Sequence, residues 1–264
     1  MWKERFGNRI DKLKGRVCWV TGASSGIGEY LSYELARANC KLVLSARNKA
    51  ALDEVKKRCL TTGRLTEDDI LVLPFDVKNV GYHKEAMQIV LKKFNQIDIL
   101  INNAGRSQRE FIIDTDISVD KELIDLNVLS PISLVKCVLP DMIKRKSGHI
   151  VVTSSLAGKF GLPYSASYCL SKWAINGWHE SLYCEMKQHN IDVTIVCPGP
   201  IDTKCEDNCI SNSFKKSVKK MTSSRCAELM LVAIVNKLQE VWIARQPFLF
   251  FTYLNQFLPQ LVLW

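Results

Sequence analysis

Short apolar segments alternate with amphipathic helical segments along almost the whole chain. The seven apolar segments span residues 16–21, 41–46, 70–75, 97–102, 148–154, 191–197 and 240–244. Helical periodicity fills residues 26–38, 49–60, 81–95, 118–145, 166–188 and 223–237. This alternation is typical of a parallel sheet whose crossover helices cover both faces. The pattern predicts an α/β fold with a doubly wound, parallel, seven-stranded sheet and helices on both faces.

The length of the chain suits one domain of this kind. A single hydrophobic core stops growing near about 250–300 residues, and the chain has 264. We expect one domain over residues 16–245, preceded by a basic segment (1–15) and followed by an apolar tail (246–264). Residues 199–222 are polar and basic, with few periodic apolar positions. They are expected to form a mobile substrate lid above the strand ends.

The net charge of +9 is concentrated in two segments, residues 1–16 and 204–225. Neither segment interleaves its basic residues with stacking aromatic residues or resembles a recognition helix, so no nucleic-acid partner is expected. An anionic membrane surface or a phosphorylated cofactor fits the charge better. The ten cysteines are scattered and the four histidines dispersed, which predicts reduced thiols and no metal site.

The segment 246–264 contains no charged residue. Pro247 and Pro259, together with interspersed glutamine and asparagine residues, argue against a simple membrane-spanning helix. The first residues lack the apolar core of a secretory signal. Three interpretations of the tail stay open: it packs over the substrate mouth or against a second subunit, it lies in a membrane surface, or the chain is a shortened form.

A glycine-rich turn, T-G-A-S-S-G-I-G at residues 21–28, joins the first predicted strand to the first predicted helix. Glycines permit a tight turn and a close approach of the backbone to a pyrophosphate, and the helix N-terminus offers unpaired N–H groups. This context predicts a dinucleotide site. The expected contacts from the turn are Gly22, Ser24, Ser25, Gly26, Ile27 and Gly28.

The next strand ends supply the rest of the expected nucleotide site. Arg47 follows the second strand where an acid would bind a ribose 2′-hydroxyl, so we expect it to pair with a 2′-phosphate, and NADPH to be the cofactor. Asp76 follows the third strand and is expected near the adenine amino group. Small residues after the fourth strand, Asn103, Ala104 and Gly105, would let the backbone lie against the nucleotide.

Tyr168 and Lys172 lie four residues apart and therefore share one face of a predicted helix. An ammonium beside a phenol favours the phenolate, which makes the tyrosine a usable proton shuttle. Ser155, after the fifth strand, can hold a substrate carbonyl oxygen. Tyr183 and Lys187 have the same spacing, but they lie farther along the helix, away from the strand ends where ligands bind. Tyr168 is therefore the expected acid.

Taken in order, these motifs resemble the short-chain dehydrogenase/reductase superfamily, with its Rossmann-type fold, over about residues 15–245. The resemblance implies that Asn127 holds a water in a proton relay through Lys172 to Tyr168. It adds Pro198, Gly199 and Thr203 to the expected cofactor contacts, beside Tyr168 and Lys172. Residues 68–77, 223–231 and 240–259 are most similar to a membrane-associated group of NADPH-dependent carbonyl reductases of the endoplasmic reticulum.

The expected function is NADPH-dependent reduction of ketones or aldehydes of lipophilic, steroid- or retinoid-like molecules, with hydride transfer to the carbonyl carbon. The expected substrate contacts are Ser155, Leu156, Tyr164 and Tyr168, with Phe160 and Leu162 nearby. The alternative is a non-catalytic NADPH-binding scaffold or sensor at a membrane surface. The resemblance implies association with the endoplasmic reticulum membrane, or a cytoplasmic location if the relatives' N-terminal anchor is absent. A homodimer is a further expectation.

Overall fold

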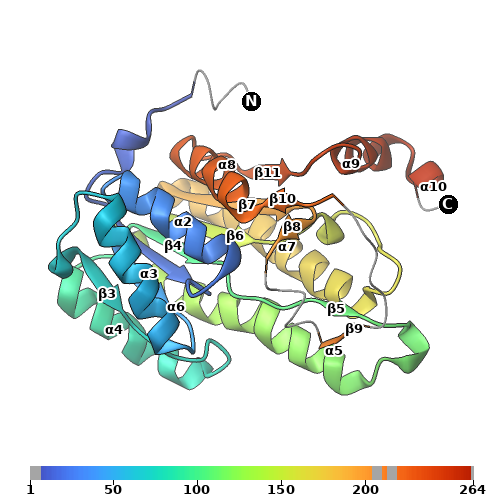
Figure 1. The fold of residues 1–264 in the computed structure, drawn as a ribbon, viewed down its shortest axis with the longest axis horizontal. Coiled ribbons are helices and arrows are strands. Elements are labelled where there is room, and N and C mark those ends of the chain that lie inside the picture. Colours follow the sequence, from blue (N-terminus) through green and yellow to red (C-terminus); the bar gives the residue numbers. More distant parts are fainter. Residues whose placement is uncertain (1–6, 204–209, 213–218, 263–264) are drawn as a thin grey trace.

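The structure is a computed structural model that describes residues 7–203, 210–212 and 219–262. Its centre is a parallel seven-stranded sheet with the strand order β11-β7-β6-β4-β1-β2-β3 (Figure 1). The strands are β1 (Val17–Thr21), β2 (Lys41–Ser45), β3 (Ile70–Val72), β4 (Ile99–Asn102), β6 (Gly148–Thr153), β7 (Ile191–Pro198) and β11 (Glu240–Ile243). All six neighbouring pairs are parallel. The predicted fold class is confirmed, because each predicted strand forms in its expected place.

The helices cover both faces of the sheet. The α-helices of the domain are α2 (Gly26–Arg37), α3 (Lys49–Thr62), α4 (His83–Phe94), α5 (Ile117–Ile124), α6 (Ser130–Arg145), α7 (Ala166–Met186) and α8 (Ser223–Val235). The 3-10 helices are η1 (Ile10–Leu13), η2 (Glu67–Asp69), η3 (Val80–Tyr82), η4 (Ile112–Asp114), η6 (Leu156–Gly158) and η7 (Lys187–His189). Two further helices, α9 (Phe248–Phe257) and α10 (Pro259–Val262), follow β11.

Alternate residues of the strands feed two separate cores. On β1, Cys18 and Val20 pack with α2, α3 and α8 on one face of the sheet. Val17 and Trp19 pack with α4, α6 and α7 on the other face. Because successive side chains of a strand point to opposite faces, a strand covered on both sides must be apolar throughout. That requirement explains why the strands appear in the sequence as continuous apolar runs.

The segment expected as one helix over 118–145 is interrupted, which corrects that prediction. A π-helical segment, η5 (Asp125–Leu129), separates α5 from α6. Pro131 has no N–H to give, and a proline ring displaces the carbonyl four residues earlier, here that of Asn127. The Ser130 backbone N–H and hydroxyl both bond to the Asp125 carbonyl, five residues back. The widened turn therefore follows from a proline whose position the sequence shows.

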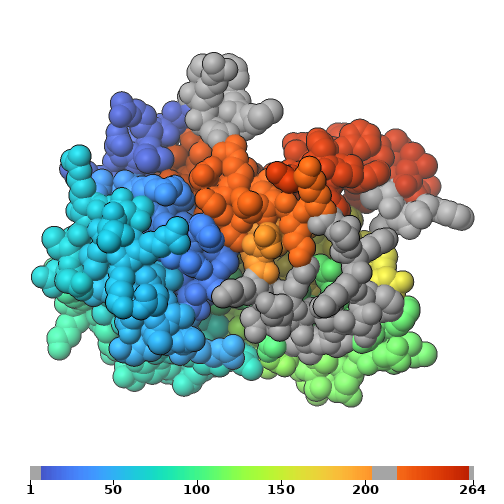
Figure 2. All heavy atoms as spheres, in the orientation of Figure 1, coloured from blue at the N-terminus to red at the C-terminus, as the bar shows by residue number. Residues whose placement is uncertain are grey.

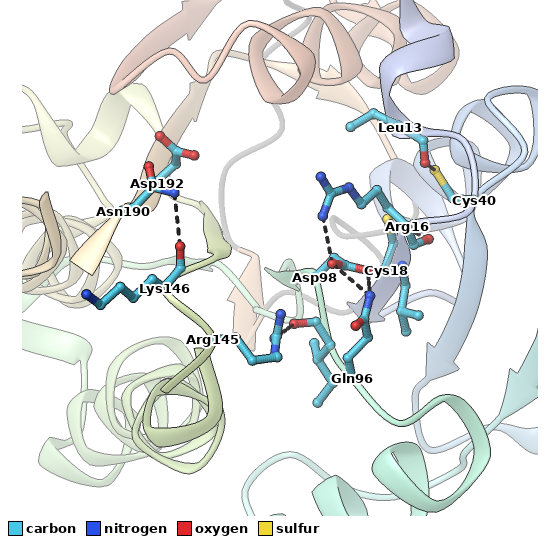
Figure 3. A network of polar contacts seen from close by, with 12 residues as sticks. Leu13, Arg16, Cys18, Cys40, Gln96, Asp98, Arg145, Lys146, Asn190 and Asp192 are labelled. Atoms are coloured by element: carbon cyan, nitrogen blue, oxygen red, sulfur yellow. Dashed lines mark hydrogen bonds and ion pairs between the residues drawn. The ribbon is translucent and has the colours of Figure 1, made fainter. Parts of the chain in front are cut away.

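A polar network lies at the edge of the sheet where β1 and β4 begin, opposite the carboxyl ends of the strands (Figure 3). The buried carboxylate of Asp98 accepts from the Val17 N–H at 2.8 Å and from the Arg16 guanidinium at 3.0 Å. The Gln96 side chain donates to both of its oxygens. Arg145, at the end of α6, donates to the Ile97 carbonyl at 2.8 Å. These bonds fix where β1 and β4 begin, and so which residues stand at their carboxyl ends.

The segment predicted as a mobile lid is described only in part. Residues 204–209 and 213–218 lie outside the described residues. Short parallel pairs join β8 (Ile201–Asp202) to β10 (Met221–Thr222), and β5 (Gln108–Arg109) to β9 (Ile210–Asn212). The backbone of the segment therefore returns to the loop that follows β4.

Candidate active site

A cavity of about 470 Å³ lies at the carboxyl ends of the central strands. Residues that follow β1, β2, β4, β6 and β7 line it, together with residues of α5, α7 and α9. Most of the predicted site residues are among them, namely Gly22, Ser24, Ser25, Gly26, Ile27, Arg47, Asp76, Asn103, Ala104, Gly105, Ser155, Leu156, Tyr168, Lys172, Pro198, Gly199 and Thr203. Gly28 is not among the lining residues and is buried.

The glycine-rich turn has the backbone geometry expected of a phosphate-binding loop. Gly22 and Gly26 adopt positive φ angles of 65° and 58°, which residues with a Cβ rarely adopt. A Cβ on Gly28 would collide with the carbonyl oxygen of Gly22. Helix α2 begins at Gly26, and the side chain of its N-cap residue, Ser25, makes no capping bond. The first-turn N–H groups of α2 therefore face the cavity without a side-chain cap from Ser25.

Hydrogen bonds connect the ends of β1, β4 and β6 at the base of the cavity. Thr21 Oγ1 accepts from the N–H groups of Asn103 at 3.1 Å and Ala104 at 3.2 Å. The Asn103 amide donates to the Thr21 carbonyl at 3.2 Å, and Thr153 Oγ1 donates to Asn103 Oδ1 at 3.2 Å. Asn103 is thus a bridge between three strand ends, which holds the backbone of the following residues against the glycine turn.

Arg47 and Asp76 stand at one end of the cavity, after β2 and near the end of β3. Arg47 is exposed, and no ion pair joins it to another residue of the described part of the chain. Asp76 is half-buried, and its Oδ1 accepts from the Lys78 N–H at 2.9 Å. Because β2 and β3 are neighbours, the two side chains lie on the same side of the glycine turn. Their contacts with the adenosine end of a cofactor stay a prediction.

Ser155, Tyr168 and Lys172 line the cavity on the β6 side of the glycine-rich turn, away from β2 and β3. The Lys172 Nζ lies 5.6 Å from the centre of the Tyr168 ring and donates to the Thr153 carbonyl at 2.9 Å. Lys172 is only 5% exposed, so its ammonium has been moved from water to a position beside the phenol. Ser155 begins η6, and its Oγ accepts from the Ala157 N–H at 3.1 Å. One helical turn of α7 thus carries both the phenol and the amine, and both line the same cavity as Ser155.

Asn127 does not line the cavity; it contacts residues of the cavity wall from the side that faces away from the cavity. It is 3% exposed and lies in the π-helical segment η5. Its side chain bonds to the backbone of Arg106 and to Ser171 Oγ. A Cβ on Gly105 would stand 3.0 Å from Asn127 Oδ1 and 3.7 Å from the Lys172 Nζ, which shows how closely these groups surround that glycine.

Two tyrosines named in the sequence analysis lie away from the cavity. Tyr164 does not line it; its ring packs against Phe111 with centres 4.9 Å apart, and its backbone has a φ of 63°. The expected substrate contact of Tyr164 therefore stays a prediction. Tyr183, the second tyrosine with a lysine four residues on, packs against the core under α4 and α6, as its distance along the helix predicts.

The structure adds lining residues that the sequence analysis did not single out. Gln108 follows the small-residue turn and is 1% exposed; its amide donates to Thr115 Oγ1 at 3.0 Å. Arg106 and Lys78 both reach Glu122 of α5, at 3.0 and 3.8 Å. Phe248, the first residue of α9, packs near Leu156. Arg106 and Gln108 could have been predicted as lining residues, because they closely follow Asn103–Gly105 in the sequence. No local sequence pattern predicts that Phe248 lines the cavity.

Comparison with known proteins places this site in a family. A family model described as short chain dehydrogenase matches residues 16–213, which is most of the chain. The chain belongs to the short-chain dehydrogenase family. Short-chain dehydrogenases are oxidoreductases whose fold binds a nicotinamide cofactor. The resemblance seen in the motifs is therefore confirmed.

Several curated short-chain dehydrogenases are similar to this chain. It is 46% identical over 273 residues to dehydrogenase/reductase SDR family member 7 of Homo sapiens, in an alignment that covers 100% of this chain and 80% of that protein. The member 7 protein of Mus musculus is 44% identical over the same length. A member 7-like protein of Drosophila melanogaster is 35% identical over 99% of this chain and 81% of its own length.

Two solved structures share the short-chain dehydrogenase fold. An alcohol dehydrogenase from the archaeon Thermococcus sibiricus, complexed with 5-hydroxy-NADP, matches 87% of this chain and 96% of its own with a TM-score of 0.76 and 23% identity. Levodione reductase matches 88% and 96% with a TM-score of 0.77 and 20% identity. At these identities the likeness concerns the fold, and the residues of the site are argued from this chain alone.

Proposed function

We propose that this short-chain dehydrogenase reduces ketones or aldehydes of lipophilic molecules with NADPH, and that Tyr168 donates the proton. The observation that carries the proposal is the placement of Ser155, Tyr168 and Lys172 in the same cavity as the glycine-rich turn and Arg47. A cofactor extended between those two ends would bring its reactive ring to the phenol. The alternative, a non-catalytic NADPH-binding scaffold, gives no reason for a buried lysine beside that phenol.

The residues present fit a dinucleotide. Gly22 and Gly26 leave the turn open toward the cavity, and the first turn of α2 supplies N–H groups for a pyrophosphate. A cavity of about 470 Å³ lies within the usual range for small-molecule and cofactor sites. Gly105 and Ala104 line the cavity with almost no side chain, so a flat nucleotide can approach the backbone closely.

The cofactor, when bound, supplies the hydride, and the chain supplies the binding and the proton. Ser155 Oγ donates to the substrate carbonyl oxygen and holds it next to the Tyr168 hydroxyl. Tyr168 transfers its proton to that oxygen as charge develops on it. Lys172, held by the Thr153 carbonyl, stabilises the phenolate that remains. Asn127 positions the loop at Arg106, and the relay water implied by the family resemblance is part of this proposal.

Arg47 supports the preference for NADPH. A ribose 2′-phosphate carries two negative charges and is suited to bidentate pairing with a guanidinium. Arg47 lines the cavity after β2, and in the described residues it has no carboxylate partner that a phosphate would have to displace. The acid that would bind a 2′-hydroxyl at this turn is absent, since residues 44–48 read Leu-Ser-Ala-Arg-Asn.

The lining on the substrate side supports a lipophilic substrate. Leu156, Phe160, Leu162 and Phe248 line the cavity near Ser155. Leu156 and Phe248 belong to the same apolar cluster, so the wall is continuous from η6 to α9. Apolar walls with few polar groups favour bulky, weakly polar molecules such as steroid- or retinoid-like carbonyl compounds.

The deciding experiment is a panel of carbonyl compounds assayed by cofactor absorbance with NADPH and NADH side by side. We expect oxidation of NADPH that depends on an added ketone or aldehyde and is fastest with large apolar compounds. NADPH that binds without carbonyl-dependent oxidation across the panel would favour the scaffold. Faster turnover with NADH would overturn the cofactor preference while leaving the reductase activity intact.

The location and assembly of the protein are also proposals. Association with the endoplasmic reticulum membrane is supported by the similarity of residues 68–77, 223–231 and 240–259 to a membrane-associated group of reductases. Fractionation of cells that express the protein tests it. A homodimer stays a prediction, which light scattering of the purified protein tests.

A further inference from the structure

Helices α9 and α10 carry a row of exposed apolar side chains that the domain leaves uncovered. We call these residues the outer face; they are Phe250, Phe251, Phe257, Leu258 and Leu261. Between 42% and 79% of each side chain's surface is exposed. The two helices stand out from the body at one edge of the molecule (Figures 1 and 2). Several exposed apolar side chains on two successive helices indicate an interaction site.

The opposite side of α9 is attached to the domain, so the exposure of the outer face is built into the fold. Phe248 packs in the apolar cluster of the cavity wall, and Thr252 is 1% exposed. The Tyr253 ring lies against Trp242 of β11, with ring centres 4.9 Å apart. The Asn255 amide donates to the Lys159 carbonyl at 3.2 Å. With these four contacts made, α9 cannot turn the outer face inward without losing them.

Helix length indicates how such a face can meet a bilayer. A spanning helix needs about 20 apolar residues, whereas α9 has 10 residues and α10 has 4. In the described part of the chain, the helical run long and apolar enough to span is Ile117–Arg145, and half of its most apolar window is buried in the domain. That run carries Asn127 behind the cavity. The outer face is therefore suited to lying in the plane of a membrane surface.

The charges near the outer face are arranged as in an interfacial helix. No charged residue occurs between residues 246 and 264. Arg245 immediately precedes the segment and donates to the Lys220 carbonyl at 3.3 Å, which brings a second cation to the same rim. Lys219 is exposed beside it. Apolar aromatic residues bordered by cations match the interior and the headgroups of an anionic bilayer.

We propose that the outer face of α9 and α10 binds the surface of an anionic phospholipid bilayer, with Arg245, Lys219 and Lys220 at the headgroups. Charge favours lipid over a second copy of the chain: the net charge of +9 attracts the chain to an anionic surface and makes two copies repel. Because Phe248 lines the cavity at the start of α9, bilayer binding would place the cavity beside the lipid. Membrane binding is separate from the reductase reaction and can be tested without it.

The test is co-sedimentation of the whole chain with phosphatidylcholine vesicles, with and without phosphatidylserine. We expect binding to the anionic vesicles that weakens with added salt. The triple variant Phe250→Ser, Phe257→Ser, Leu261→Ser removes three exposed apolar side chains and should lower the vesicle partition coefficient at least about tenfold. The matched control is Ile113→Ser, Ile117→Ser, which removes side chains 90% and 64% exposed in η4 and at the start of α5. Helix α5 lies at the lower edge in Figure 1, whereas α9 lies at the upper edge. The control should bind vesicles like the unaltered chain.

Three outcomes would overturn the proposal. In the first, the unaltered chain stays in the supernatant with both kinds of vesicle. In the second, the triple variant binds as well as the control. In the third, the chain does not bind vesicles and is a dimer in solution that the triple variant, but not the control, converts to a monomer; the outer face would then cover a second copy.

A gentler substitution keeps the test valid if the triple variant does not fold. Phe257→Trp replaces a side chain that is 79% exposed, so it leaves the packing of the domain intact. With anionic vesicles whose acyl chains carry bromine, its added fluorescence should be quenched. Ile113→Trp, at a residue 90% exposed near α5, should keep its added fluorescence. Equal quenching in the two variants, or none in either, would overturn the proposal.

Discussion

The side-chain amide of Asn127 holds both backbone polar groups of Arg106. Its Oδ1 accepts from the Arg106 N–H at 3.0 Å, and its Nδ2 donates to the Arg106 carbonyl at 2.9 Å. The same Nδ2 donates to Ser171 Oγ at 3.0 Å, and Ser171 donates to the Tyr168 carbonyl at 2.8 Å. One buried amide therefore connects the loop after β4 to the helical turn that carries Tyr168.

Replacing Asn127 with leucine tests this connection, because leucine has nearly the same size and makes none of the three bonds. The half-buried N–H and carbonyl of Arg106 would lose their bonds to this amide, so the free energy of unfolding should fall by about 3 kcal/mol. We expect the kcat of the proposed reaction to fall as well, with a shifted pH profile. Urea unfolding and a pH–rate profile measure the two effects. Lower stability with an unchanged profile would limit Asn127 to a folding role.

Tyr168→Phe tests the proposed acid. The ring and its place beside Lys172 remain, so the dissociation constant for NADPH, measured by fluorescence titration, should change little. Loss of the hydroxyl should lower kcat by about 10²–10⁴-fold. Tyr183→Phe is the matched control on the same helix, because Tyr183 packs in the core away from the cavity. Retained turnover in Tyr168→Phe would place the proton donor elsewhere.

Arg47→Asp tests the cofactor preference. The carboxylate would repel a 2′-phosphate and could accept from a 2′-hydroxyl, so the ratio of kcat/KM for NADPH to that for NADH should fall by about 10–100-fold. Lys49→Asp is the control, since Lys49 carries the same charge two residues on, pairs with Asp53 and does not line the cavity. An unchanged ratio in Arg47→Asp, or an equal shift in both variants, would argue against the pairing.

Gly28→Ala should disrupt the glycine-rich turn. The added Cβ would collide with the Gly22 carbonyl oxygen. This oxygen belongs to the backbone, so moving it would cost folding free energy. We expect a lower melting temperature and weaker NADPH binding in calorimetry. Gly177→Ala on α7 is the matched control, because no atom lies within 4 Å of its Cβ position; it should be neutral or stabilise the helix by up to about 1 kcal/mol. Equal effects of the two changes would contradict this account of the turn.

Two buried histidines should make the fold sensitive to acid. Burial lowers the pKa of His149 and of His179 to about 4 in the folded protein. In the unfolded chain the pKa of a histidine is about 6.5. Because the folded pKa is the lower one, the unfolded state binds more protons below about pH 6.5, and stability is lost as the pH falls toward 4. At pH 5 each histidine should cost about 2 kcal/mol relative to neutral pH.

Urea unfolding at pH 7.5 and pH 5 measures this loss. His179→Leu should flatten the pH dependence, because its ring makes one bond, to the Ile175 carbonyl of its own helix, and the leucine cannot take up a proton. An unchanged slope in that variant would mean that His179 does not titrate between the folded and unfolded states as its burial predicts.

The sequence by itself determined the sheet, the glycine-rich turn and the pairing of Tyr168 with Lys172. Strands covered on both faces must be apolar throughout, and helices that cover them repeat their apolar residues every three or four positions. Both patterns are local, and so is the spacing of a tyrosine and a lysine on one helical turn. The order of strands and helices then placed Ser155 and the glycine-rich turn at the same edge of the sheet, because parallel strands all end there.

Only the tertiary structure decided which side chains form the walls. Tyr164 stands near Tyr168 in sequence yet turns outward onto Phe111, while Phe248 reaches the cavity from the far end of the chain. Pro131 marks the widened turn in the sequence, but the bonds of Asn127 to Arg106 depend on how the domain holds the loop after β4 beside that turn. The physical reason is that periodicity reports whether a side chain is buried, whereas its partner is chosen by packing between segments distant in sequence.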